Sequence, residues 1–137
     1  MPELPEVETI ARGLLPLIHG RRIAQVEVLF LGSVQGDLRT FTQQLTGQAI
    51  QGVRRRGKLL LFELSNRMFL VGHLKMTGKF LFFPPGETTI NAHTRCIVHF
   101  DDESVLVFQD QRKFGYLRCM GEKELLRWSF FARLGPE

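Results

Sequence analysis

The sequence has few cysteines, no long apolar run and no apolar leader, and each absence excludes a class of protein. Only two of its 137 residues are cysteines, Cys96 and Cys119. They stand too far apart for a C-x-x-C motif, so we expect reduced, buried thiols, with a disulfide as the less favoured alternative. No apolar stretch approaches the roughly 20 residues that span a bilayer, and the acidic N-terminus lacks the apolar segment of a signal peptide. We therefore expect a cytoplasmic protein that does not enter a membrane.

What is present is the composition of one globular domain with an excess of basic residues. Apolar residues make up 44% and charged residues 23% of the chain, a length and mixture that suffice for a real core. The net charge of +4 suits a polyanionic partner without requiring one. No internal repeat or low-complexity tract is visible. We expect a single domain over residues 1–137, present as a monomer.

Hydrophobic periodicity predicts a mainly β domain with flanking helices. Apolar residues at helical spacing predict one helix from Pro5 to about Leu14, weakened beyond that point by glycine and proline. A second helix is expected after Asp37, and a last one over residues 122–133. Alternation at period two predicts a strand near residues 22–28. Further strands are expected near residues 49–55, 58–64, 68–74, 79–83, 95–100, 105–108 and 115–119. The pattern indicates an antiparallel β-sandwich of about eight strands plus two or three helices.

The first residues of the chain combine two features. Removal of Met1 would leave Pro2 as a free secondary amine beside the carboxylate of Glu3. An N-terminal amine has a pKa of about 7.7–8.0, against about 10.4 for lysine, so much more of it is neutral near pH ~7.5. A neutral amine can attack an electrophilic carbon and form a Schiff base. The same residues also suit a capped helix start, with a proline and two glutamates in the first turn. Both interpretations remain open on the residues alone.

The longer string MPELPEVET resembles the N-terminus of formamidopyrimidine-DNA glycosylases, and the resemblance extends over the whole chain. It implies a bifunctional DNA glycosylase and abasic-site lyase of base excision repair, acting on oxidised purines in damaged double-stranded DNA. In the implied mechanism the Pro2 amine attacks C1′ of a flipped nucleotide and Glu3 acts as general acid and base. Family members continue with a helix–two-turn–helix domain and usually a four-cysteine zinc finger. The resemblance therefore implies the N-terminal catalytic domain alone, with no cofactor in this chain and a zinc ion in the absent C-terminal domain.

Residues 54–58 form a cluster of four cations in five residues at the start of an apolar strand. Such a run is most often a solvated face. Cations such as Arg56 and Lys58 can also neutralise phosphates and release counterions, and Gly57 permits close approach of the backbone to a ligand. By resemblance, Lys58 matches the lysine that contacts the phosphate beside the lesion and supports catalysis.

The stretch Gly72–Gly78 places a methionine at what the pattern predicts to be a polar hairpin tip. Met76 either folds back onto the core or acts as a wedge that fills the gap left by a flipped nucleotide. His73 either ends a strand or, by resemblance, contacts a backbone phosphate near the lesion.

The stretch Asp110–Gly115 fits the family pattern D-x-R-[RK]-F-G at every position. The simpler interpretation is a basic turn closed by glycine, with Phe114 in the core. The resemblance implies instead that Arg112 hydrogen-bonds the base left opposite the lesion, for which its planar fork is suited, and that Phe114 wedges beside that base. Together with Met76 these residues favour the formamidopyrimidine branch. An endonuclease VIII-like enzyme for oxidised pyrimidines and a catalytically silent DNA-binding fragment are the alternatives.

One further pattern could suggest a metal site. His93, Cys96 and His99 have the spacing H-x-x-C-x-x-H, but residues three apart on a strand point to opposite faces. We therefore expect no metal in this chain.

Overall fold

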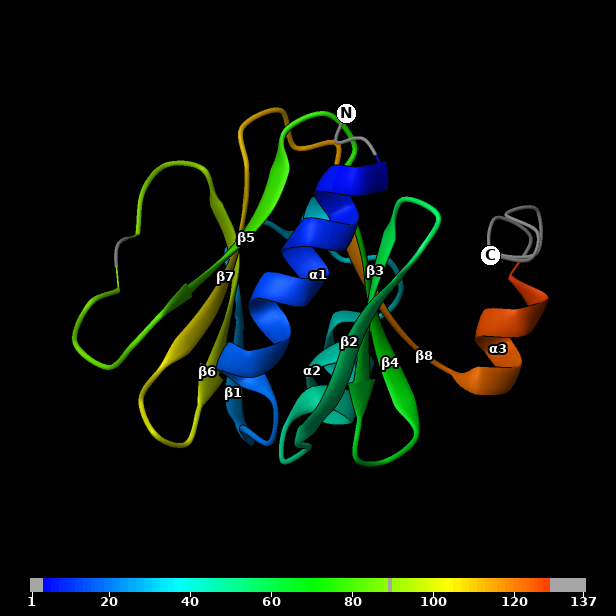
Figure 1. Cartoon of the computed structure of the whole chain (residues 1–137), viewed down its shortest axis with the longest axis horizontal. Coiled ribbons are helices and arrows are strands. Elements are labelled where there is room, and N and C mark those ends of the chain that lie inside the picture. Colours follow the sequence, from blue (N-terminus) through cyan, green and yellow to red (C-terminus); the bar gives the residue numbers. More distant parts are fainter. Residues whose placement is uncertain (1–3, 89, 129–137) are drawn as a thin grey trace.

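A computed structural model of the chain describes residues 4–88 and 90–128 (Figure 1). The helices are α1 (Leu4–Ile18), α2 (Leu38–Leu45) and α3 (Glu122–Arg127), with a short 3-10 helix at Leu31–Ser33. The strands are β1 (Ile23–Val28), β2 (Ile50–Arg56), β3 (Leu59–Leu64), β4 (Met68–His73), β5 (Gly78–Phe83), β6 (Thr94–Phe100), β7 (Val105–Asp110) and β8 (Tyr116–Gly121).

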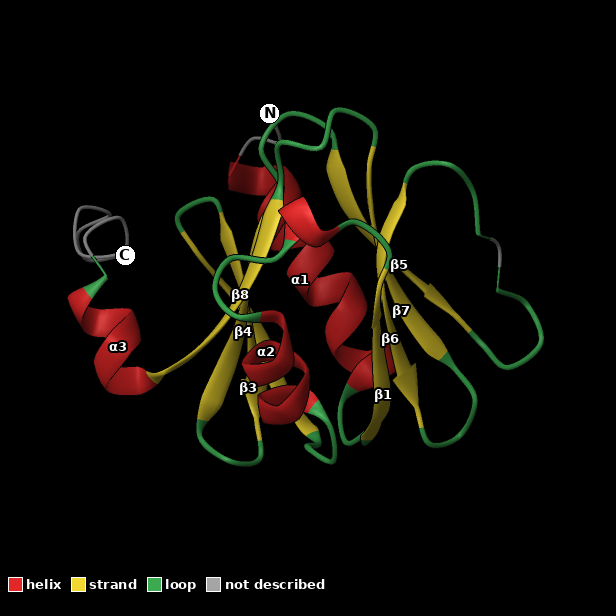
Figure 2. Cartoon of the chain, turned by 180° about the vertical axis from the view of Figure 1, so that it is seen from behind, coloured by secondary structure: helices red, strands yellow, loops and turns green. Residues whose placement is uncertain are grey.

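The strands form two four-stranded antiparallel sheets, in the orders β1-β6-β7-β5 and β2-β3-β4-β8. The sheets face each other, and two helices fill the open sides between them (Figures 1 and 2). α1 packs against the edge strands β2 and β5, whereas α2 packs against the opposite edge strands β1 and β8. The predicted antiparallel sandwich with flanking helices is thus confirmed.

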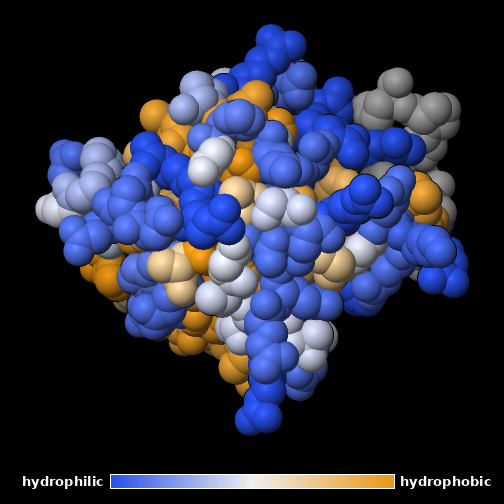
Figure 3. All heavy atoms as spheres, turned by 90° about the horizontal axis from the view of Figure 1, so that it is seen from below, coloured by the Kyte–Doolittle hydropathy of each residue, from blue (hydrophilic) through white to orange (hydrophobic). Residues whose placement is uncertain are grey.

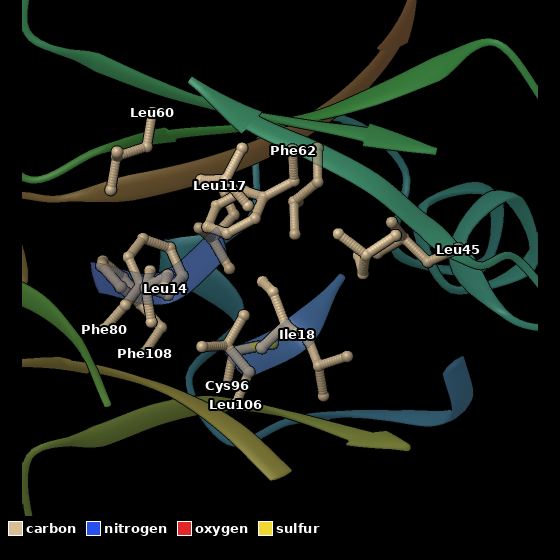
Figure 4. Packing of buried hydrophobic residues seen from close by; sticks show 14 of the residues in the cluster. Leu14, Ile18, Leu45, Leu60, Phe62, Phe80, Cys96, Leu106, Phe108 and Leu117 are labelled. Atoms are coloured by element: carbon tan, nitrogen blue, oxygen red, sulfur yellow. The ribbon is translucent and has the colours of Figure 1, made fainter. Parts of the chain in front are cut away.

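One apolar core joins the two sheets and α1 (Figure 4). Phe62 of β3 lies edge-on to Phe80 of β5 with ring centroids 5.1 Å apart, and Phe80 lies 5.2 Å from Phe108 of β7. Leu14 and Ile18 of α1 are buried in the same cluster. Full burial of a side chain of this size stabilises the fold by about 1.5–3 kcal/mol. Apolar contact therefore accounts for the association of two sheets that share no strand.

Helix boundaries differ from the sequence-based expectation where packing outweighs local preference. The first helix was expected to weaken near Leu14, yet α1 continues through the exposed Pro16 to Ile18, which is fully buried. The last helix was expected to reach residue 133, but α3 ends at Arg127. Trp128 leaves helical geometry there, and its ring stands edge-on to Tyr116 at 6.4 Å. Residues 129–133 lie outside the described part of the chain.

The connection around Met76 is also different from the prediction. The residues between β4 and β5 do not form a hairpin tip, because β4 and β5 belong to different sheets. The chain instead crosses from one sheet to the other over residues 74–77. Gly78 is the first residue of β5, and its N–H donates to the Leu74 carbonyl at 2.8 Å. A Cβ at Gly78 would lie 2.6 Å from that carbonyl oxygen, so the tight crossing requires glycine.

Candidate nucleic-acid interface

Three connections that the sequence singled out lie at one end of the sandwich, where α1 also begins (Figure 1). They are the β2–β3 turn at residues 57–58, the β4–β5 crossover at residues 74–77 and the β7–β8 crossover at residues 111–115. We call this the crossover end. Loops held by a rigid scaffold are common places for binding residues, so this end is the candidate interface.

The two crossovers lie side by side. One joins β4 to β5 and the other joins β7 to β8, and the strands at their ends are neighbours in each sheet. β4 pairs with β8, which sets His73 opposite Tyr116. β5 pairs with β7, which sets Gly78 opposite Asp110. The β4–β5 and β7–β8 loops therefore run in opposite directions between the sheets, and their ends are neighbours in each sheet. Residues far apart in sequence are brought together in this way.

Two large apolar side chains of the crossovers are exposed. Met76 is 50% exposed and Phe114 is 60% exposed. The simpler interpretations, in which Met76 folds back onto the core and Phe114 belongs to it, are therefore wrong. The wedge roles themselves stay predictions, since no nucleic acid is present.

The second crossover is fixed through its backbone while its basic residues remain exposed. The Arg112 N–H donates to Thr77 Oγ1 at 3.1 Å and to Asp110 Oδ1 at 3.2 Å. Lys113 has a φ of 63°, and its Nζ lies 4.8 Å from the centre of the Phe30 ring. Because the backbone of this loop is already held in place, a basic side chain on it can contact a base edge or a phosphate without first ordering the loop.

His73 is buried beneath the crossovers in a neutral form. It is only 2% exposed, its ring stacks on Tyr116 at 5.4 Å, and its Nδ1 accepts a hydrogen bond from the Lys75 N–H at 3.0 Å. Burial, followed by the positive charges of Lys75 and Lys58, lowers the His73 pKa from 6.5 to about 4. With Nδ1 accepting, the neutral ring carries its proton on Nε2. His73 can therefore donate one hydrogen bond to an anion without adding a positive charge.

The basic run at residues 54–58 contacts carboxylates of the protein itself. Arg54 Nε donates to Glu63 Oε1 at 2.7 Å, and Arg55 Nε lies 3.6 Å from Glu8 Oε2. Two of the four cations thus face carboxylates within the protein. Arg56 and Lys58 are both half-buried, and Lys58 lies in the two-residue turn with Gly57, whose φ is 58°. Glycine at a positive φ is typical of such tight hairpins.

The predicted catalytic pair, Pro2 and Glu3, lies outside the described residues. In the helix that follows them, the Glu8 carboxylate lies 3.5 Å from Arg12 and 3.6 Å from Arg55 of β2. This contact holds the beginning of α1 against β2 at the crossover end. Lys58 belongs to the turn that ends the same strand.

Asp110, Thr77 and Gly115 are site residues whose part the sequence reasoning missed. Asp110 is 1% exposed, and its side chain accepts hydrogen bonds from all three of Thr77 Oγ1, the Arg112 N–H and the Gly115 N–H. The available signal was the first position of the D-x-R-K-F-G pattern. An aspartate can organise the backbone of a turn that follows it.

The histidine pattern does not form one cluster. The His93 carbonyl accepts from the Asp110 N–H at 2.9 Å at the crossover end, whereas His99 lies further along β6, 3.0 Å from Glu27 Oε1. Both thiols are free, as expected, and Cys96 is buried while Cys119 is partly buried. Burial raises the pKa of both thiols to about 12. Within residues 4–88 and 90–128, no group of three or more His, Cys, Asp or Glu side chains is arranged to hold a metal ion. Over the same residues no helix has the length and apolarity needed to cross a membrane.

Comparison with known proteins points to one family. The sequence model described as "Formamidopyrimidine-DNA glycosylase N-terminal domain" matches residues 1–117. The formamidopyrimidine-DNA glycosylase of Lactiplantibacillus plantarum is 42% identical over 137 residues, which are all of this chain and 50% of that protein. The Streptococcus pyogenes serotype M6 protein of the same name is 44% identical, over all of this chain and 49% of that protein. The chain thus spans about half the length of the curated relatives it matches.

Solved structures agree with the sequence comparison. A crystal structure of Lactococcus lactis Fpg (MutM) with DNA containing FAPY-dG has a TM-score of 0.89 at 33% identity, covering 98% of this chain and 50% of that one. The complex of Lactococcus lactis Fpg with DNA containing an abasic site has a TM-score of 0.90 at 33% identity, covering 99% and 50%. The likeness includes both sheets, since nearly the whole chain is covered.

Proposed function

Because the chain belongs to the formamidopyrimidine-DNA glycosylase family, we propose that it forms the N-terminal catalytic domain of a base-excision-repair enzyme. The substrate class is damaged double-stranded DNA that carries oxidised purines. Two Lactococcus lactis structures to which the chain is similar hold DNA with FAPY-dG and with an abasic site, and this supports both a glycosylase and a lyase activity. The endonuclease VIII-like alternative is not favoured, because the Lactiplantibacillus plantarum and Streptococcus pyogenes relatives of this chain are formamidopyrimidine-DNA glycosylases.

The observation that carries this proposal is the composition of the crossover end. An exposed methionine, Met76, and an exposed phenylalanine, Phe114, flank the basic residue Arg112 on two adjacent loops. An apolar side chain can enter a base stack and occupy the space of an extruded nucleotide. In this assignment Met76 fills the lesion strand, Phe114 wedges beside the opposite base, and Arg112 hydrogen-bonds that base.

Residues at the ends of β2 and β4 are assigned to bind the phosphates beside the lesion. Lys58 provides a positive charge and His73 an uncharged Nε2 donor, and the two lie close enough for Lys58 to contribute to the low His73 pKa. Arg56 adds a further cation on the strand that leads into the same turn. A charged and a neutral donor together can fix a phosphate while limiting the cost of burying positive charge.

Catalysis is assigned to the N-terminal amine. With Met1 removed, the Pro2 nitrogen attacks C1′ of the flipped sugar as the bond from C1′ to the damaged base breaks. Glu3 serves as general acid and base on the sugar and the resulting iminium. Elimination then cleaves the strand at the neighbouring phosphates. A helix–two-turn–helix domain and a zinc finger, both outside this chain, are proposed to supply most of the grip on DNA, and the enzyme is proposed to act as a monomer in the cytoplasm.

Borohydride trapping on an abasic duplex tests this assignment. Reduction of the iminium should link the chain covalently to DNA, and the link should map to Pro2 in preparations from which Met1 has been removed. Retained Met1 turns the Pro2 nitrogen into an amide without a nucleophilic lone pair, so trapping should fail. Equal trapping with Met1 fully retained would reject the Pro2 mechanism. A chain that binds DNA but is never trapped would instead be a DNA-binding fragment.

A further inference from the structure

One side-chain hydroxyl joins the two crossovers. Thr77 Oγ1 donates to Asp110 Oδ1 at 2.5 Å and accepts from the Arg112 N–H at 3.1 Å. Thr77 directly follows Met76, and Arg112 stands two residues before Phe114. The hydroxyl therefore links the residue next to one exposed apolar side chain with the backbone that carries the other.

Asp110 supplies the fixed point to which this hydroxyl is attached. Its carboxylate is almost fully buried, and Oδ2 accepts from the Gly115 N–H at 2.5 Å while Oδ1 accepts from Arg112 at 3.2 Å. The same carboxylate therefore holds the second crossover near its beginning and at its end. A Cβ at Gly115 would lie 2.8 Å from Oδ2 and 2.9 Å from the His73 carbonyl oxygen. Gly115 therefore packs closely against this carboxylate and against the end of β4.

Resting on the proposed function, we propose that Thr77 is a positioning residue that makes Met76 and the Arg112–Phe114 segment one rigid unit. Both apolar side chains then enter the duplex at a fixed separation, instead of each loop ordering independently on DNA. A pre-organised pair of wedges avoids part of the entropy cost of ordering two loops at once. The hydroxyl carries this role, because both contacts of Thr77 are made through Oγ1.

Two substitutions separate the hydroxyl from the shape of the side chain. Thr77→Val removes the hydroxyl and keeps the branched shape, whereas Thr77→Ser keeps the hydroxyl and removes the methyl group. Amide hydrogen exchange of the isotope-labelled chain gives a readout that needs no DNA. Thr77→Val should speed exchange of the Arg112 amide by about tenfold or more, as expected when a local opening becomes easier. Thr77→Ser should stay close to the unsubstituted chain.

The same experiment contains its own check on folding. The Gly115 amide is held by the other oxygen of Asp110, and the Phe100 amide donates to the Ser104 carbonyl at the far end of the sandwich. Both should keep their protection in Thr77→Val. If that variant lost protection everywhere, Thr77→Ala would replace it under the same criteria. An Arg112 amide that exchanges equally in the chain with and without the hydroxyl would overturn the proposal.

A double-mutant cycle extends the test to DNA. Met76→Ala and Phe114→Ala are combined in the Thr77 and Thr77→Val backgrounds, and binding to an abasic duplex is measured at low salt. With Thr77 present, the loss in the double variant should differ from the product of the single losses by about fivefold or more. Without the hydroxyl, the loss in the double variant should equal the product of the two single losses. Equal coupling in both backgrounds would also overturn the proposal. Failure of the unsubstituted chain to bind any duplex at low salt would contradict the assignment of the crossover end to DNA contacts, and the exchange result would then decide the proposal.

Discussion

The two ends of the sandwich share one core but are built differently. At the end opposite to the crossovers, the turns at residues 65–67 and 101–104 connect neighbouring strands of the same sheet. We call it the hairpin end. There Arg21 pairs with Asp102, donates to the Leu17 carbonyl at 2.6 Å and stacks on Phe82 at 4.9 Å. Seen from this side, the surface is largely hydrophilic (Figure 3).

At the crossover end the carboxylate is used in the opposite way. Asp110 is buried and accepts hydrogen bonds from loop backbone, so it leaves Arg112 and Lys113 exposed instead of pairing with them. Met76 and Phe114 are exposed beside these cations. The Asp102 carboxylate at the hairpin end thus pairs with a cation, whereas the Asp110 carboxylate at the crossover end holds loop backbone and leaves Arg112 exposed.

The largest expected effect concerns the core that both ends share. Phe62→Ala should lower the free energy of unfolding by about 3–5 kcal/mol, because Phe62 is fully buried between the sheets. Chemical denaturation measures the loss, and amide exchange should show that both ends lose protection together. Leu126→Ala is the control, since Leu126 is 59% exposed and its loss should stay within about 0.5 kcal/mol. Loss of protection at one end alone would mean that the ends fold separately.

The next effect is a pH dependence that belongs to the crossover end. Because the His73 pKa is lowered from 6.5 to about 4, between these values the unfolded chain takes up a proton that the folded chain does not. Above pH 6.5 His73 is neutral in both states and does not reduce stability. As the pH falls toward 4, the free energy of unfolding decreases by about 3 kcal/mol at most. His73→Gln should make urea denaturation less dependent on pH across this window. The exposed His19, at the hairpin end, is the matched control, and an unchanged profile in His73→Gln would contradict the prediction.

Substitution of two glycines by alanine should change the free energy of unfolding in opposite directions. Gly115→Ala should destabilise the fold by about 1–3 kcal/mol through overpacking, since its Cβ would meet Asp110, His73 and Phe108 at 3.0 Å or less. Gly13→Ala should stabilise by about 0.5–1 kcal/mol, because Gly13 lies within α1 with nothing within 4 Å of the added Cβ. Denaturation curves of both variants decide this. A neutral Gly115→Ala would show that the crossovers are more loosely packed than the distances indicate.

The wedge can be separated from general binding by the choice of substrate. Met76→Ala, placed at the equivalent position of a full-length relative, should reduce excision of a paired lesion about tenfold more than cleavage of a pre-formed abasic site, which is easier to extrude. Stability should not change, because the side chain is half exposed. Leu17→Ala, near the hairpin end, is the control because Leu17 is 45% exposed. Equal losses on both substrates would assign Met76 to packing.

The smallest effect is on the salt dependence of binding. Each phosphate contact changes the slope of log K against log salt by roughly −0.9. We expect this chain alone to bind duplex DNA weakly, with a slope of about three or four contacts. Arg112→Ala should weaken binding, whereas Arg21→Ala at the hairpin end should change neither the affinity nor the slope. Nanomolar binding at physiological salt by the chain alone would show that the rest of the enzyme is dispensable.

Several features of the fold followed from sequence periodicity because they are local. The strands were predicted to within about two residues of their observed bounds. Asp37 was expected to cap α2, and its side chain accepts from the Thr40 N–H at 2.9 Å. The motif residues Met76, Arg112 and Phe114 were identified from their types and order. The roles of these residues and of Pro2 remain predictions, because nothing in the structure contacts DNA and the first residues are not described.

Other features were decided only by tertiary contacts. α1 passes Pro16 because burial of Ile18 outweighs the local penalty, and Arg54 is used by Glu63 on the neighbouring strand. A hairpin and a crossover can have equally short connections, so the four residues after β4 do not reveal which one forms. That depends on which strand each partner pairs with. The Thr77–Arg112 contact joins positions 35 residues apart, and it exists because two sheets pack through a core that no local pattern specifies.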